Sequence, residues 1–301
     1  MDDLDGTDGA IAFIGFGEAA EAFAVGWGAG RAGAVRAFDA KCADEAALPR
    51  ERALRAGVRL TDDRAAALAD ARAVFCLVTA DRAVEAAEQA APFLRPGAFW
   101  FDGNSCSPGA KRRAAGIVAA AGARYVDVAI MAPVYPGRHR TPLLVAGPHA
   151  DAAAAVLAAL DMTAKVAGAV VGDASSIKMI RSVMIKGMEA LTAECLLAAR
   201  RAGVEAQVLA SLGASNPAID WPRQAAYNLE RMMVHGRRRA AEMHEVAATL
   251  AELGLPNGLA RATADWQQRI GDLELAAGQD DFAHRADHVL RGLAAAEPGR
   301  G

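Results

Sequence analysis

The sequence of 301 residues has few cysteines, no marked excess of either charge and no long apolar run. Its four cysteines form no Cys-x-x-Cys pair, which argues against a disulfide framework or a structural zinc site. No stretch reaches the roughly 20 apolar residues that a membrane helix needs, so we expect no membrane association. The formal net charge is only −3, and we expect no nucleic-acid partner. Positions 1–9 are acidic and lack the basic flank of a signal peptide, which favours a cytoplasmic protein.

Lysine is also scarce, because arginine supplies most of the 33 basic residues. Arginine stays protonated in proteins, whereas a desolvated lysine can release its proton. A lysine at an unusual place is therefore a candidate for proton transfer. The five lysines are Lys41, Lys111, Lys165, Lys178 and Lys186.

The first half of the chain alternates short apolar runs with alanine-rich segments of helical character. Continuous apolar runs between helices indicate a parallel sheet that is buried on both faces. This order predicts a doubly wound α/β domain. The expected strands are Ala10–Gly15, Ala34–Asp39, Ala73–Thr79, Ala98–Asp102 and Arg124–Ile130, with Leu143–Ala146 and Ala164–Val171 as two candidate edge strands.

The pattern changes after Gly172, where apolar residues recur at three- and four-residue steps. We therefore predict two domains, an α/β domain over residues 1–172 and an all-helical domain over residues 173–301. The expected helices of the second domain are Ala174–Gly203, Glu205–Leu212, Pro222–Leu253, Gly258–Ile270 and Asp280–Leu293.

A glycine-rich turn follows the first expected strand and has the G-x-G-x-x-A form of a dinucleotide-binding, Rossmann-type turn. Gly15 allows the tight turn, Gly17 allows the backbone to approach a pyrophosphate, and Ala20 permits close packing of helix on strand. The helix that begins near Glu18 would point its N-terminus at the phosphates. A glycine turn without a ligand is the alternative in such an alanine- and glycine-rich chain.

Asp39 ends the second expected strand, 24 residues after Gly15. An acidic residue at about this spacing binds the ribose hydroxyls of a dinucleotide. A carboxylate there repels a 2′-phosphate and so favours NAD. Arg36 and Lys41 lie nearby and could instead pair with such a phosphate, so NADP remains possible.

These residues, together with four further segments, resemble the β-hydroxyacid dehydrogenase family, which includes 3-hydroxyisobutyrate dehydrogenase and 6-phosphogluconate dehydrogenase. The resemblance covers most of the chain, and the helical half is most similar to a phosphogluconate-dehydrogenase-like branch. The Gly-x-Ala-x-x-x-Lys pattern ending at Lys178 is more specific than the glycine motif, which many families share. The matching segments are GFGEAA at 15–20, VFCLVT at 74–79, DGNS at 102–105, VDVA at 126–129 and GDASSIK at 172–178.

The resemblance implies an NAD(P)-dependent oxidoreductase that moves a hydride between nicotinamide and a hydroxyl-bearing carbon of a small, hydroxy-acid-like substrate. Lys178 would act as the general acid and base, taking the hydroxyl proton in oxidation and returning one in reduction. Ser182 lies one helical turn later, where relatives usually have asparagine, and would be the second catalytic residue. The resemblance also implies a homodimer formed through the helical half.

The resemblance assigns further residues to cofactor and substrate. The implied cofactor contacts are Gly15, Phe16, Gly17, Glu18, Ala19, Ala20, Asp39, Val78, Thr79 and Ser105, and the implied substrate contacts are Asn104, Ser105, Met131 and Arg239. A simple turn before Pro108 is the alternative for Asn104 and Ser105, and a solvated basic helix face is the alternative for Arg239.

The sequence departs from its relatives after Asp127. Relatives carry a Ser-Gly-Gly segment there that holds a substrate carboxylate through backbone N–H groups, whereas this chain has Met131-Ala132-Pro133-Val134-Tyr135-Pro136. Its two prolines have no N–H to donate. An imine-reducing or decarboxylating enzyme on the same fold is therefore one alternative, and a non-catalytic NAD(P)-binding sensor is another. We expect no metal site.

Overall fold

The computed structural model describes residues 11–32, 34–43 and 48–296. They form two compact units, which divide between Met179 and Ile180. The first unit contains a sheet covered by helices and the second is all-helical, so the predicted fold class is confirmed. The division lies inside the long helix α8 (Asp173–Arg201), whereas the sequence pattern placed the boundary just before that helix. The first turns of α8 belong with the sheet because Gly172 and Ser175 bond to a strand, as described below.

The sheet has eight strands in the order β3-β2-β1-β4-β5-β6-β7-β8. All strands predicted from apolar runs are present, and only the two-residue edge strand β3 was missed. The strands are β1 (Ile11–Ile14), β2 (Arg36–Phe38), β3 (Arg59–Leu60), β4 (Ala73–Cys76), β5 (Phe99–Asp102), β6 (Arg124–Ile130), β7 (Leu143–Ala146) and β8 (Ala164–Gly168).

One strand departs from the predicted parallel sheet, because β7 runs antiparallel to β6. The segment between these strands contains only a single 3-10 turn, Arg138–Arg140, and no crossover helix. A parallel return normally needs such a helix, whereas an antiparallel neighbour does not. The remaining paired strands of the sheet are parallel, so β1, β4, β5 and β6 all end at the same edge.

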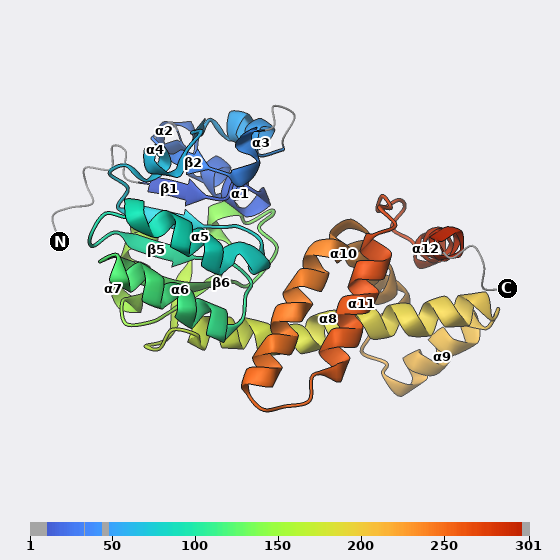
Figure 1. The fold of residues 1–301 in the computed structure, drawn as a ribbon. Helices are drawn as coiled ribbons and strands as arrows, with labels where there is room; N and C mark the ends of the chain where they lie inside the picture. Colours follow the sequence, from blue (N-terminus) through green and yellow to red (C-terminus); the bar gives the residue numbers. More distant parts are fainter. Residues whose placement is uncertain (1–10, 33, 44–47, 297–301) are drawn as a thin grey trace. The chain divides into compact units, whose positions relative to one another are not determined.

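Helices cover both faces of the sheet, and Figure 1 shows α5 and α6 across its near face. Successive side chains of a strand point to opposite faces of the sheet, so the strands contribute to two apolar clusters. Phe13, Phe75 and Phe101 belong to one cluster, and Val74 and Trp100 belong to the other. Many of the helical residues in these clusters are alanines, which let the helices approach the strands closely. The helices of this unit before α8 are α1 (Glu18–Trp27), α2 (Ala29–Ala32), α3 (Leu48–Ala56), α4 (Arg64–Leu68), α5 (Ala83–Ala90), α6 (Pro108–Ala120) and α7 (Ala150–Ala159).

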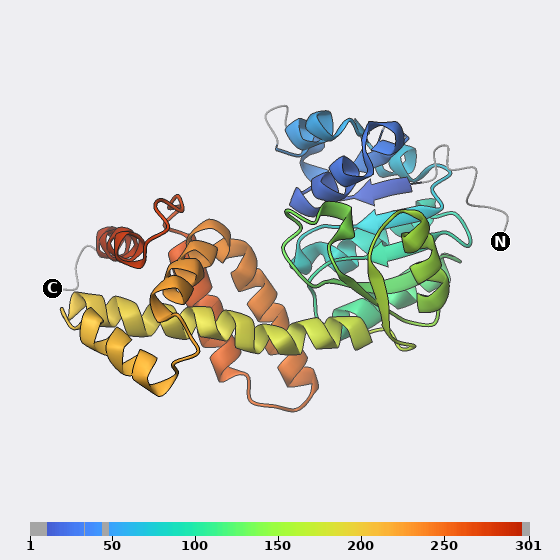
Figure 2. The ribbon, with the colours of Figure 1, turned by 180° about the vertical axis from the view of Figure 1, so that it is seen from behind.

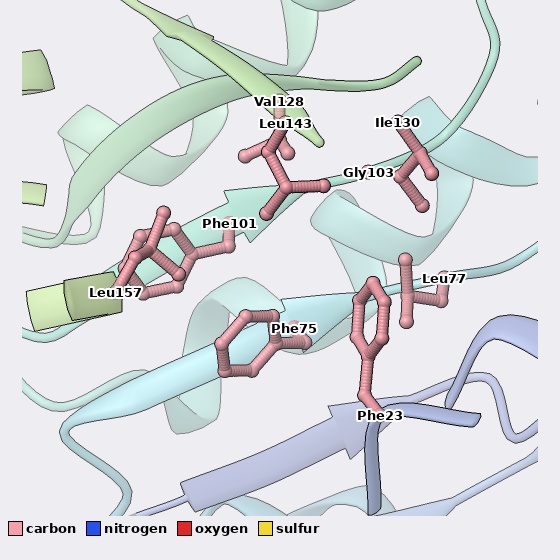
Figure 3. Close-up of a pocket in the computed structure, with 9 residues that line it drawn as sticks. All are labelled: Phe23, Phe75, Leu77, Phe101, Gly103, Val128, Ile130, Leu143 and Leu157. Carbon is pink, nitrogen blue, oxygen red and sulfur yellow. The ribbon is translucent and has the colours of Figure 1, made fainter. Parts of the chain in front are cut away.

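A small cavity of about 10 Å³ lies inside this core, next to the ends of β4 and β5. Figure 3 shows Phe23 and Phe75 pointing toward the space beside Leu77 and Gly103. A water molecule there would find no polar side chain, so the cavity is a packing gap and not a ligand site. The residues that line it are Phe23, Phe75, Leu77, Phe101, Gly103, Val128, Ile130, Leu143 and Leu157.

Each helix that the sequence predicts for the second domain is present, with ends that differ by a few residues. Leu196, Leu229, Met232 and Ile270 are buried in the core of the helical unit. Figure 2 shows α9 running alongside the last turns of α8. Among the described residues, no helix combines the length and apolar composition needed to cross a bilayer. After α8, the helices are α9 (Glu205–Ser215), α10 (Trp221–Glu252), α11 (Gly258–Gly271) and α12 (Phe282–Ala296).

Helices α10 and α11 cross at a pair of glycines. A Cβ atom on Gly236 would collide with the backbone of Gln267 and Gly271, and one on Gly271 would lie 2.5 Å from the backbone nitrogen of Arg237. Neither obstacle is a flexible side chain that could move aside. The two helix backbones are therefore in direct contact at this crossing.

We expect Gly236→Ala to destabilise the helical unit by about 1 to 3 kcal/mol or more, because the added methyl group forces the helix backbones apart. The matched control is Gly213→Ala on α9, where a Cβ meets no atom within 4 Å. That variant should gain up to about 1 kcal/mol from helix propensity. Urea unfolding followed by circular dichroism measures both. Equal effects of the two substitutions would contradict the packing interpretation.

Candidate active site

The turn after β1 has the geometry that its glycines predict. Gly15 has a φ of +88°, and its N–H donates to the carbonyl oxygen of Phe38 at 2.8 Å. A Cβ on Gly15 would lie 2.6 Å from the carbonyl oxygen of Leu77, so a larger residue does not fit. A Cβ on Gly17, in contrast, would meet nothing within 4 Å. The space at the N-terminus of α1 is therefore open, and the N–H groups there suit a phosphate.

Asp39 lies beside this turn and is held by it. Its Oδ2 accepts a hydrogen bond from the Phe16 N–H at 2.8 Å, and its Oδ1 accepts one from the Lys41 N–H at 2.9 Å. Each carboxylate oxygen can accept a second bond, so the group can still receive ribose hydroxyls. Arg36, one of the two cations that could favour a 2′-phosphate, donates instead to the carbonyl oxygen of Ala66 at 3.1 Å.

The loops that follow β4 and β5 are joined by Asn104. Its Oδ1 accepts from the Val78 N–H at 2.7 Å, and its Nδ2 donates to Asp102 Oδ1 at 2.7 Å. The side chain is buried, and its amide bonds to groups of the protein, while the expected substrate contact stays a prediction. Val78 itself adjoins the glycine turn, since a Cβ on Gly15 would lie 2.8 Å from its Cγ1. Thr79 follows and is exposed.

Lys178 and Ser105 meet although 73 positions separate them in the sequence. The Nζ of Lys178, in the second turn of α8, donates to the Oγ of Ser105 at 2.7 Å. Both side chains are half-buried. The structure thus joins the predicted catalytic lysine to the loop after β5, at the edge of the sheet where parallel α/β folds bind their ligands.

Three charged side chains to which the sequence analysis gave no role form a buried cluster in the same unit. Lys111 in the first turn of α6, Asp102 at the end of β5 and Asp127 on β6 are all without solvent exposure. The Lys111 Nζ lies 3.1 Å from Asp102 Oδ1 and 3.4 Å from Asp127 Oδ1. Sheet register pairs Asp102 with Asp127, which places both carboxylates side by side.

Asp127 also bonds to the beginning of α8. Its Oδ2 accepts from the N–H groups of Gly172 and Ser175 at 3.1 and 3.0 Å, and from the Ser175 hydroxyl at 3.1 Å. The first turn of a helix carries unpaired N–H groups and partial positive charge. The single positive charge of Lys111 is shared between two carboxylates. The N–H groups at this helix end supply additional stabilisation for the negative charge of Asp127.

Burial and charge shift the titration of this cluster. Burial and the neighbouring carboxylates raise the pKa of Tyr125, whose hydroxyl donates to Asp102 Oδ2 at 2.7 Å. Burial disfavours the charge on Lys111, but Asp102 and Asp127 outweigh it and raise its pKa above the ordinary value. Lys111 therefore stays positively charged. The scarcity of lysine was the one signal in the sequence that could have marked it.

Ser182 and Met131 occupy other surroundings. Ser182 is buried, and its Oγ accepts a hydrogen bond from Lys186 Nζ at 3.2 Å, while Lys186 pairs with Glu242 at 2.9 Å. Met131 follows β6 and is half-buried, and its N–H donates to the carbonyl oxygen of Pro142 at 2.9 Å. The catalytic role of Ser182 and the substrate role of Met131 stay predictions.

Arg239 is a buried structural residue of the helical unit. Its Nε donates to Glu189 Oε2 at 3.0 Å, and its Nη2 pairs with the other oxygen of the same carboxylate. Gln267 donates to Glu189 at 2.7 Å and completes the cluster. The guanidinium therefore binds a carboxylate of the protein itself, and the expected contact with substrate stays a prediction.

The described residues contain no group of three or more His, Cys, Asp or Glu side chains arranged to hold a metal ion.

Residues 10–174 match the family model for the NAD binding domain of 6-phosphogluconate dehydrogenase. Residues 199–270 match a domain of unknown function, DUF1932. No curated protein matches the chain.

Solved structures resemble the chain over most of its length. A conserved hypothetical protein from Sinorhizobium meliloti 1021 is 39% identical, with 95% of this chain and 97% of that chain covered and a TM-score of 0.72. The conserved protein MTH1747, described as structurally similar to 3-hydroxyacid dehydrogenases, is 30% identical (87% and 97% covered, TM-score 0.63). The 3-hydroxyisobutyrate dehydrogenase of Mycobacterium tuberculosis, solved with L-serine, is 19% identical (94% and 99% covered, TM-score 0.69) and has the same fold.

These matches agree with the geometry of the glycine turn. The sheet unit is an NAD(P)-binding domain, so the predicted class of cofactor is confirmed. The resemblance seen in the sequence is confirmed as well, because the matching family model spans more than half of the chain. The chain belongs to the β-hydroxyacid dehydrogenase family.

Proposed function

We propose that this protein is an NAD(P)-dependent oxidoreductase that transfers a hydride between nicotinamide and a hydroxyl-bearing carbon of a small, hydroxy-acid-like molecule. The observation that carries the proposal is the hydrogen bond from Lys178 to Ser105 at 2.7 Å. The loop that holds Ser105 follows β5 and the glycine turn follows β1, and these parallel strands end at the same edge of the sheet. An amine and a dinucleotide-binding turn at one edge of a sheet are the parts that such a reaction needs.

Lys178 moves the proton in this proposal. In oxidation its neutral amine accepts the proton of the substrate hydroxyl, and in reduction its ammonium returns a proton to the carbonyl oxygen. The bound nicotinamide supplies the hydride chemistry. Ser105 accepts a hydrogen bond from Lys178 and so limits the directions in which the flexible lysine side chain can point.

We also propose that the protein prefers NAD to NADP. Two backbone N–H groups hold the Asp39 carboxylate beside the glycine turn, at the place where a 2′-phosphate would arrive. A carboxylate next to the ribose repels a 2′-phosphate and so disfavours NADP. The Nη1 of Arg36 donates to the carbonyl oxygen of Ala66, which directs this side chain toward α4.

Replacing the catalytic lysine tests the reaction directly. We expect Lys178→Met to lower kcat by about 10²- to 10⁴-fold, the usual contribution of general acid–base catalysis, while NADH binding stays nearly unchanged. The matched control is Lys165→Met on β8, because Lys165 is exposed. The measurement is turnover on a panel of 3-hydroxy acids, phosphorylated sugar acids and cyclic imines, with both cofactors.

Full activity of Lys178→Met on the best panel member would contradict the proposed role. Turnover of the wild type on cyclic imines alone would favour imine reduction on the same fold. Tight NADH binding without turnover of any panel member would favour the non-catalytic sensor.

Cofactor choice depends on the charge of Asp39. We expect Asp39→Asn to shift the ratio of NADH to NADPH affinity toward NADPH by about tenfold, or about 1.4 kcal/mol, since the amide keeps the shape but loses the charge. Titration of cofactor fluorescence measures both dissociation constants without a substrate. A wild-type protein that binds NADPH more tightly than NADH would contradict the proposal.

Alanine substitutions of the two glycines of the turn should affect different properties, NADH affinity for Gly17 and stability for Gly15. Gly17→Ala should weaken NADH binding by at least about tenfold, because the methyl group enters the open space over the α1 N-terminus, while stability changes by no more than about 1 kcal/mol. Gly15→Ala should instead lower stability, because its Cβ meets the Leu77 backbone at a φ of +88°. Thermal unfolding and NADH titration separate the two. Unchanged NADH affinity in Gly17→Ala would exclude the turn as the phosphate site.

A further inference from the structure

The buried cluster of Lys111, Asp102 and Asp127 takes no part in the proposed proton transfer, yet its two carboxylates hold the segments that carry Ser105 and Lys178. Asp102 Oδ1 accepts from the N–H and the Nδ2 of Asn104 at 3.0 and 2.7 Å. Asn104 immediately precedes Ser105, so Asp102 fixes the start of that loop.

Asp127 fixes the other segment. Its Oδ2 receives the Gly172 and Ser175 N–H groups, which lie at the beginning of α8. Lys178 lies one turn after Ser175 on the same helix. The direction in which α8 leaves the sheet, and with it the position of the Lys178 amine, therefore depends on Asp127.

Lys111 links the two carboxylates. Its Nζ contacts a carboxylate oxygen of each, and it donates to the carbonyl oxygen of Asp102 at 2.5 Å and to that of Val128 at 3.4 Å. Two carboxylates on neighbouring strands repel one another without a cation between them. Stability alone does not require this arrangement, because apolar side chains of similar volume often replace a buried ion pair without loss.

We propose that Lys111 is a positioning residue: by bridging Asp102 and Asp127 it sets the loop of Ser105 and the first turns of α8 at the spacing where Lys178 meets Ser105. The inference deepens the proposed function and rests on it for the role of Lys178. The contact between Lys178 and Ser105 is nevertheless measurable without any substrate.

The test follows the titration of Lys178 by NMR after reductive ¹³C-methylation of the lysines. The chain has only five lysines, so the spectrum is simple, and Lys178→Arg assigns the signal. Ser105 accepts a hydrogen bond from the ammonium form and so favours it. We expect Ser105→Ala to lower the midpoint of the Lys178 signal by about one pH unit, an ordinary size for an environmental shift.

Lys111→Met also deletes a positive charge, which by itself raises the pKa of a neighbouring lysine, so the readout is the effect of Ser105→Ala in each background. In the Lys111→Met background, Ser105→Ala should cause no further shift of the Lys178 midpoint, because the contact between Lys178 and Ser105 is already lost. A Ser105→Ala shift of the same size in both backgrounds would overturn the proposal. No shift in Ser105→Ala would overturn it as well.

Lys111→Met leaves two buried carboxylates without their cation and could fail to fold. Lys111→Met/Asp102→Asn removes one of those charges, and an asparagine there can accept from Asn104 and donate to the Tyr125 hydroxyl. Because this variant loses one positive and one negative charge, it should fold and show a lowered Lys178 midpoint from the lost Ser105 contact alone. A wild-type midpoint in the folded double variant would overturn the proposal.

Arg285→Met is the matched control, because Arg285 is a buried cation of the helical unit that donates to the Ala226 carbonyl oxygen and pairs with Asp280. It should lower the unfolding midpoint and leave the Lys178 signal unchanged. A Lys178 shift of the same size in Arg285→Met would show a general effect of destabilisation and overturn the proposal. Absence of turnover in the wild type together with the expected shifts would reject the proposed function but keep the positioning role.

Discussion

The common register of the parallel strands is the constraint on which the rest of the site depends. Ile14 of β1 pairs with Cys76 of β4, Cys76 pairs with Asp102 of β5, and Asp102 pairs with Asp127 of β6. These four residues form one row across the sheet. The glycine turn, the Val78 loop and the Ser105 loop all leave the sheet at this row. Three segments that are far apart in the sequence therefore meet at one place.

The row also explains why charges lie inside an alanine-rich core. Two of its four members are aspartates, and each uses its carboxylate to hold backbone N–H groups of a segment that leads to the site. Burying them is costly without partners. Lys111, Tyr125 and the N-terminus of α8 supply those partners, and each comes from a different element of the sheet unit. The polar interior and the site above it are therefore one connected structure.

The sequence predicted those parts of the molecule that short segments specify. The turn at Gly15, the position of Asp39 beside it and the long helix that carries Lys178 all follow from local patterns, and the structure places each of them as the patterns indicate. The direction of β7 was missed because it depends on a connection that lacks a helix. The sheet register that brings Asp102, Lys111 and Asp127 together is likewise absent from any local motif. Arg239 was assigned to substrate through the resemblance, and no local motif could indicate its ion pair with Glu189, which lies 50 positions away on another helix.

The central claim is that the Lys178 amine faces the reacting end of a dinucleotide that the turn at Gly15 holds. A crystal structure of the protein with bound NADH tests it most directly. The account predicts the pyrophosphate at the N-terminus of α1, and the Lys178 ammonium directed at the nicotinamide ring while still bonded to Ser105. A Lys178 side chain that points into bulk water, away from the ring, would contradict it.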